Sequence, residues 1–144
     1  MQATGNLGPA ILNQLLVAGF KVTVLTRKSS THNLPSSITA IPVNYDSLDS
    51  LTNALHGQEA VVSTIASAAI ASAAIATQLL LVEAAAKAHV RHFIPSEFGS
   101  DRQNKKARAF PIYKDKAAVQ ATLKNAAASS GMTYTLICTG PFLD

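Results

Sequence analysis

The sequence predicts an α/β fold in which a doubly wound parallel sheet is flanked by helices. Segments with helical periodicity alternate along the chain with short β-branched runs, and the connections between them are short. With 144 residues the chain has the length of one domain, so residues 1–144 are expected to form a single domain. Its 48% hydrophobic and 14% charged residues indicate a folded globule rather than a disordered segment.

Helices are recognised by apolar residues that recur every three or four positions. Pro9 suits the first turn of the first helix, and Asp46 is the expected N-cap of the second. Gly131 follows the last helix, where a glycine commonly ends one. The expected helices cover residues 9–18, 47–56, 70–88 and 113–129.

The extended runs lie between these helices. Pro42 stands inside the second run, which places that strand at or near an edge of the sheet. A helix opens the pattern, whereas a strand normally does, so the usual first strand is expected to be absent. The expected strands cover residues 21–26, 38–43, 61–65, 92–95 and 133–138.

Composition narrows the class of protein further. Cys138 is the single cysteine, which excludes an internal disulfide and makes a reducing, cytoplasmic location the expectation. The first eight residues lack the pattern of a secretory leader. The uncharged stretch over residues 60–82 is rich in Ala and Ser, and we expect a buried strand followed by a helix there rather than a membrane span.

A glycine-containing segment leads into the first helix: Thr4-Gly5-Asn6-Leu7-Gly8. Glycines at such a turn let a phosphate approach the backbone, while the helix N-terminus supplies N–H donors and a partial positive charge. The segment is therefore a candidate site for the phosphates of a dinucleotide. An ordinary turn before a helix uses glycine as well, so both interpretations stay open.

Arg27 and Lys28 follow the first expected strand, where a Rossmann unit selects its cofactor. An acidic side chain at this point holds the ribose hydroxyls of NAD, whereas Arg meets the 2′-phosphate of NADP. The pair therefore favours NADP, and its alternative is a solvated pair at a strand end. A full G-x-x-G-x-x-G motif would have glycine where Gln2 stands.

Several stretches along the whole chain match one known pattern. The most specific is Phe93-Ile94-Pro95-Ser96-Glu97-Phe98-Gly99, and the others cover residues 3–8, 24–27, 61–64, 116–120, 134–135 and 140–144. On these residues the chain resembles the NmrA-like and isoflavone-reductase-like family of atypical short-chain dehydrogenases. The resemblance implies a Rossmann-type sheet that here lacks its usual first strand and most of the C-terminal substrate domain.

The resemblance also implies a function. The first hypothesis is an NADPH-dependent oxidoreductase-type domain that transfers hydride to a small organic substrate of aromatic or phenylpropanoid-like type. The second is an NmrA-like redox sensor that binds NAD(P) without turnover and acts through a protein partner. The third is a fragment of a longer reductase that does not function alone.

By motif, the resemblance implies that Lys116 is the catalytic acid or base. The Tyr-x-x-x-Lys spacing of the classical enzymes is absent, because neither Lys114 nor Lys116 has a tyrosine four residues before it. A lysine takes this role only where burial or neighbouring positive charge alters its proton affinity. The related plant enzymes carry an arginine where this chain has Gln120. An ordinary surface lysine is the alternative interpretation.

Other polar residues are weaker candidates. Ser96 and Glu97 follow an expected strand, at the sheet edge where α/β folds place ligands. His89 and His92 have no third ligand nearby in the sequence, so no metal site is expected. The net charge of +4 favours anionic ligands. The basic segment over residues 102–116 has no recognition helix or aromatic platform, and we expect neither nucleic acid nor membrane as a partner.

Overall fold

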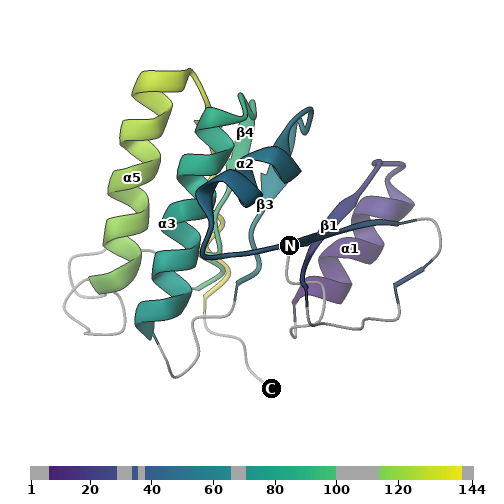
Figure 1. Cartoon of the computed structure of the whole chain (residues 1–144). Coiled ribbons are helices and arrows are strands. Elements are labelled where there is room, and N and C mark those ends of the chain that lie inside the picture. The colour runs from purple at the N-terminus through teal and green to yellow at the C-terminus, as the bar shows by residue number, and fades with distance from the viewer. Residues whose placement is uncertain (1–6, 29–33, 36–37, 66–70, 100–113, 141–144) are drawn as a thin grey trace.

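The computed structural model describes residues 7–28, 34–35, 38–65, 71–99 and 114–140 (Figure 1). Within these ranges helices and strands alternate, which confirms the α/β class predicted from the sequence. The helices are α1 (Gly8–Val17), α2 (Leu48–Leu55), α3 (Ala71–Lys87) and α5 (Lys114–Ser130). The strands are β1 (Thr23–Arg27), β2 (Thr39–Val43), β3 (Ala60–Val62), β4 (His92–Ile94) and β5 (Thr133–Tyr134).

The strand pairs within the described residues are all parallel and form two sheets. β1 pairs with β2 in one sheet, and β4 lies between β3 and β5 in the other. Among the described residues no ladder joins β1 to β3. In a doubly wound sheet the first strand lies between the second and the fourth, and β1 and β3 correspond to those two strands. β2, which contains Pro42, lies at an edge as expected.

The main hydrophobic core joins α2, α3 and α5 to both sheets. α3 lies between α2 and α5 and contacts both of them (Figure 1). Leu51 of α2, Val82 of α3 and Leu123 of α5 are fully buried in this core. Phe93 of β4 and Leu25 of β1 complete it from the sheets, so burial of apolar area holds the two sheets in one body.

A second, smaller core covers the other face of β1. It consists of Leu12 on α1, Val24 on β1 and Ile38 just before β2. Val24 and Leu25 are neighbours in a strand, so their side chains point to opposite faces of the sheet. Helices therefore cover both faces of β1, which is the doubly wound arrangement that the sequence predicts.

The start of α2 differs from the prediction. Ser47 is the N-cap, and its Oγ accepts a hydrogen bond from the Ser50 N–H at 3.2 Å. Asp46 lies one residue earlier, in a turn where its N–H donates to Asn44 Oδ1 at 3.1 Å. The prediction of Asp46 as the N-cap is wrong, because the Asn44 side chain forms this turn and moves the helix start one residue on.

β3 and β5 contain three and two residues and are shorter than expected. Their hydrogen bonding to β4 continues beyond these ends. The Ser63 N–H donates to Ile94 O at 2.8 Å, and the Thr135 N–H donates to Phe93 O at 3.1 Å. The predicted strands thus include Ser63 and Thr135, which still form backbone hydrogen bonds with β4 although they lie beyond the regular strands.

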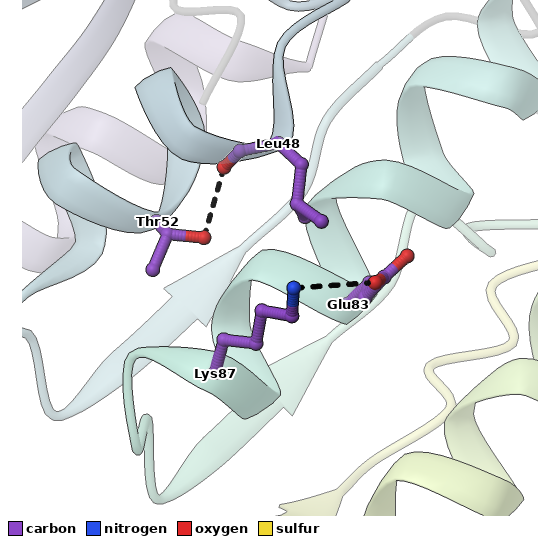
Figure 2. Close-up of polar contacts among 4 residues, drawn as sticks. All are labelled: Leu48, Thr52, Glu83 and Lys87. Carbon is purple, nitrogen blue, oxygen red and sulfur yellow. Dashed lines mark hydrogen bonds and ion pairs between the residues drawn. The ribbon is translucent and has the colours of Figure 1, made fainter.

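The apolar stretch over residues 60–82 divides into β3 and the first part of α3, as predicted. In the part of the chain that the structure describes, no helix is long and apolar enough to cross a membrane. Figure 2 shows polar contacts within the two neighbouring helices: Thr52 Oγ1 donates to Leu48 O at 2.8 Å, and Lys87 Nζ lies 3.8 Å from Glu83 Oε1. Each contact joins residues of one helix. Between the helices, Leu51 and Leu55 of α2 share the main core with Val82 of α3.

Tyr45, which follows β2, ties that loop to β1. Its hydroxyl donates to Leu25 O at 2.9 Å. Burial raises the pKa of Tyr45, and the positive charge of Arg27 opposes part of this rise. The folded protein therefore favours the neutral phenol, which is the form that donates this hydrogen bond.

We expect Phe93→Ala to lower the free energy of unfolding by about 3–5 kcal/mol, because Phe93 is 0% exposed and its removal leaves a cavity. Phe20→Ala is the matched control. The Phe20 side chain is 62% exposed, so the same change should stay within about 0.5 kcal/mol of wild type. Urea unfolding measures both values, and equal losses in the two variants would contradict the described core.

We expect Tyr45→Phe to lower the free energy of unfolding by about 1 kcal/mol near neutral pH, because one part-buried hydrogen bond is lost. The wild-type contribution is fully present below the unfolded tyrosine pKa of about 10, and it is lost as the pH rises through the higher folded pKa. Urea unfolding across this alkaline range should show a smaller decline in the variant. Identical declines in both proteins would contradict the assigned contact.

Candidate functional site

Two residues of the predicted phosphate segment, Leu7 and Gly8, lie at the start of α1. Leu7 is the N-cap of this helix, and Gly8, its first residue, is buried. The Leu7 side chain makes no capping hydrogen bond, as expected for a residue without a polar group. An anion can accept hydrogen bonds from backbone N–H groups that no side chain caps. The N-terminus of α1 could therefore hold a phosphate group. Thr4, Gly5 and Asn6 lie outside the described residues.

Arg27 and Lys28 lie at the carboxyl end of β1. Arg27 is the last residue of the strand, Lys28 is in the turn that follows, and both are exposed. Among the described residues neither forms an ion pair with a carboxylate. An exposed guanidinium can approach a phosphate with two parallel hydrogen bonds, so this strand end suits a 2′-phosphate better than a ribose hydroxyl pair.

Ser96 connects three elements at the carboxyl end of β4. Its Oγ donates to Ile65 O, just after β3, at 2.7 Å. Its N–H donates to Oε1 of Gln78, on α3, at 2.8 Å. These two hydrogen bonds fix the chain where it leaves β4. Ser96 therefore stabilises the fold at the carboxyl end of this strand.

Lys116 and Glu97 are brought together at the same edge. Nζ of Lys116, in the first turn of α5, donates to Glu97 O at 2.8 Å. The Glu97 residue is 3% exposed, and Lys116 is half-buried. One helical turn after Lys116, Gln120 Nε2 lies 3.4 Å from Glu97 Oε2. The ammonium is thus held by a backbone carbonyl at the carboxyl end of β4, where it could donate a proton to a bound ligand.

The other predicted candidates have different surroundings. Nδ1 of His92 lies 2.7 Å from Thr133 Oγ1, and its Nε2 lies 3.1 Å from Thr135 Oγ1, so the ring bridges β4 and β5. His89 is exposed and has a positive φ of 57° just beyond α3. No group of three or more potential metal ligands occurs among the described residues. The basic residues over 102–108 lie outside them.

Sequence reasoning missed Gln78 and Tyr45. The signal for Gln78 is an amide within a helix of Ala, Leu and Val, because a polar side chain in such a run needs a partner when it is buried. The signal for Tyr45 is weaker, since it is only a tyrosine two residues beyond the end of a strand. Neither signal identifies the partner, since Ser96 and Leu25 are distant in the sequence.

Comparison with known proteins gives one consistent result. All 144 residues match the NmrA-like family. Oxidoreductase aprR of Aspergillus flavus is 40% identical over 147 aligned residues, covering 99% of this chain and 47% of the relative. This chain therefore spans about half the length of the curated relatives it matches.

Solved structures share the fold. One comes from work on pinoresinol-lariciresinol and phenylcoumaran benzylic ether reductases and their relationship to isoflavone reductases; it aligns with a TM-score of 0.80 and 27% identity, over 96% of this chain and 47% of the other. Another contains NADP⁺ and (+)-pinoresinol and aligns with a TM-score of 0.73 and 25% identity, over 93% and 46% of the two chains. With the family pattern matched from residue 1 to 144, these alignments show that the chain belongs to the NmrA-like family.

Proposed function

We propose that this chain is an NADPH-binding, oxidoreductase-type domain that takes part in hydride transfer to a small organic molecule of aromatic or phenylpropanoid-like type. The observation that carries the proposal is the 2.8 Å hydrogen bond from Lys116 Nζ to Glu97 O. It holds an ammonium at the carboxyl end of β4, and open α/β sheets bind their ligands outside the carboxyl ends of their strands.

The cofactor would lie across two strand ends. Residues 4–8 would hold its phosphates at the N-terminus of α1, and Arg27 with Lys28 would hold the 2′-phosphate. When bound, NADPH supplies the hydride. The exposure of both cations and the NADP⁺ bound in one structural relative support this assignment.

Lys116 would supply the proton. In the structure Nζ acts as a hydrogen-bond donor toward Glu97 O, as the charged ammonium does. A hydride that reaches a substrate carbon leaves negative charge on the neighbouring atom, and a proton given by this ammonium neutralises that charge. Lys116 would thus act as the acid in reduction, and the neutral amine as the base in the reverse direction.

A redox sensor that binds the cofactor without turnover is the second candidate. Gln120 favours it, because an uncharged amide lies near the Glu97 carboxylate where the related plant enzymes carry arginine. Such a protein would pass its signal to a protein partner. Tight binding of NADP⁺ without NADPH oxidation on any substrate would support this candidate, whereas a chain that fails to fold alone would indicate a fragment of a longer reductase.

We expect Arg27→Ala to weaken NADPH binding by roughly 10- to 100-fold, because a charge-assisted contact with the 2′-phosphate is lost. NADH binding should stay unchanged, since NADH has no such phosphate. Lys21→Ala removes the same charge from the amino-terminal side of β1 and is the matched control. Calorimetric titration measures each affinity, and an equal loss for NADPH and NADH would exclude the assigned role of Arg27.

We expect Lys116→Met to slow NADPH oxidation by about 10²- to 10⁴-fold, the usual contribution of a general acid. Phenylpropanoid-type compounds, with (+)-pinoresinol among them, form the substrate panel. Lys124→Met changes an exposed lysine two helical turns further along α5 and should leave the rate unaltered. NADPH affinity should be the same in all three proteins. Equal turnover in wild type and Lys116→Met would remove Lys116 from the mechanism.

A further inference from the structure

Gln78 is a polar side chain in the interior of the molecule. It is 5% exposed on α3, the helix packed between α2 and α5. Burial of an amide is unfavourable unless a hydrogen bond replaces its contact with water. Gln78 Oε1 obtains this bond from the Ser96 N–H, at 2.8 Å. The helix is thereby connected to the segment that leaves β4.

The bonded peptide lies inside a tight turn. The Glu97 N–H donates to Pro95 O at 2.7 Å, which closes a three-residue turn with Ser96 at its centre. The orientation of the Ser96 peptide therefore fixes the direction of the residue that follows. Glu97 O, the acceptor for Lys116 Nζ, belongs to that residue.

The space around this carbonyl is limited. A Cβ atom on Gly99 would lie 3.2 Å from Glu97 O, which is tighter than an ordinary contact. Gly99 O in turn accepts the Gly140 N–H at 3.1 Å, so the segment is also tied to the chain beyond β5. The segment that carries this carbonyl is thus held on both sides, by the Gln78 contact before it and by the Gly140 contact after it.

We propose that Gln78 is a positioning residue: by holding the Ser96 peptide it sets the position of Glu97 O, and thereby the position and proton affinity of the Lys116 ammonium. Gln78 acts through the turn and contacts Ser96. The effect of Gln78 on turnover rests on the proposed function of Lys116. The hydrogen bonds from Ser96 to Gln78 and from Lys116 to Glu97 do not depend on that function.

Trace acetylation with acetic anhydride tests the link without substrate or cofactor. Only the neutral amine reacts, so the rate at each lysine over a pH series reports its proton affinity and its accessibility together. The proteins are wild type, Gln78→Met, which keeps the length of the side chain without its acceptor, and Gln78→Glu, which keeps an acceptor oxygen. Lys21 and Lys124, both exposed and away from the turn, are internal references.

We expect Gln78→Met to raise the acetylation rate of Lys116 by about threefold or more and to shift its pH dependence to lower pH. A carbonyl that is no longer held in place stabilises the ammonium less well. Gln78→Glu, whose carboxyl oxygen can again accept from the Ser96 N–H, should return the Lys116 rate to the wild-type value or below it. The reference lysines should not change.

An unchanged Lys116 profile in folded Gln78→Met would overturn the proposal, and so would an equal rise at all lysines, because that would indicate general loosening. If circular dichroism shows that Gln78→Met is unfolded, Gln78→Asn decides, since its shorter amide remains polar but withdraws the acceptor from Ser96. Turnover that survives in Lys116→Met would refute the proposed function while leaving the labelling result intact, so the two failures are distinguishable.

Discussion

The close packing of α3 is the constraint on which the rest of this structure depends. Val82, Ala84 and Ala85 are all 0% exposed, and α3 contacts both α2 and α5. Small alanine side chains let neighbouring elements approach closely, and a larger side chain would force them apart or off their preferred rotamers. Because α3 also carries Gln78, the same packing determines where the segment after β4 can lie.

Buried polarity is concentrated at one end of the main core. Among the described residues, the buried polar side chains are Ser63, Thr64, Gln78 and Glu97. Two of them directly follow β3, one lies in the turn after β4, and Gln78 holds that turn. Open α/β sheets bind their ligands outside the carboxyl ends of their strands, so these buried polar groups lie at the edge where the proposed site is located.

The sequence predicts the order and type of the elements well, because these depend on local periodicity. The apolar residues of α2 recur every three or four positions, and the β-branched run around Val61 marks a strand whatever its partners are. The predicted N-cap of α2 is wrong by one residue, because the choice between Asp46 and Ser47 depends on a turn formed by the Asn44 side chain.

The candidate site, too, is predicted only in part: the sequence suggests its residues but not the contacts between them. The sequence offers Lys116 and Glu97 as separate candidates, but no local pattern indicates that the ammonium of one meets the carbonyl of the other across 19 positions of the chain. Gln78 could be suspected as a lone amide in an apolar helix, yet its partner depends on how α3 packs against the sheet. Contacts of this kind follow from the fold as a whole rather than from any single segment.

The two sheets support different halves of the proposed site. α1 packs in the small core through Leu12, whereas α5, which carries Lys116, packs in the main core through Val119 and Leu123. β1 serves both cores, through Val24 on one face and Leu25 on the other. Under the proposed function, a dinucleotide that reaches from α1 to the end of β4 would contact both parts, and a ligand that binds only the assembled arrangement stabilises it by mass action. Cofactor binding would then stabilise the packing of the two sheets against each other, and this packing would in turn favour cofactor binding. β1 would connect the two effects, because it packs in both cores.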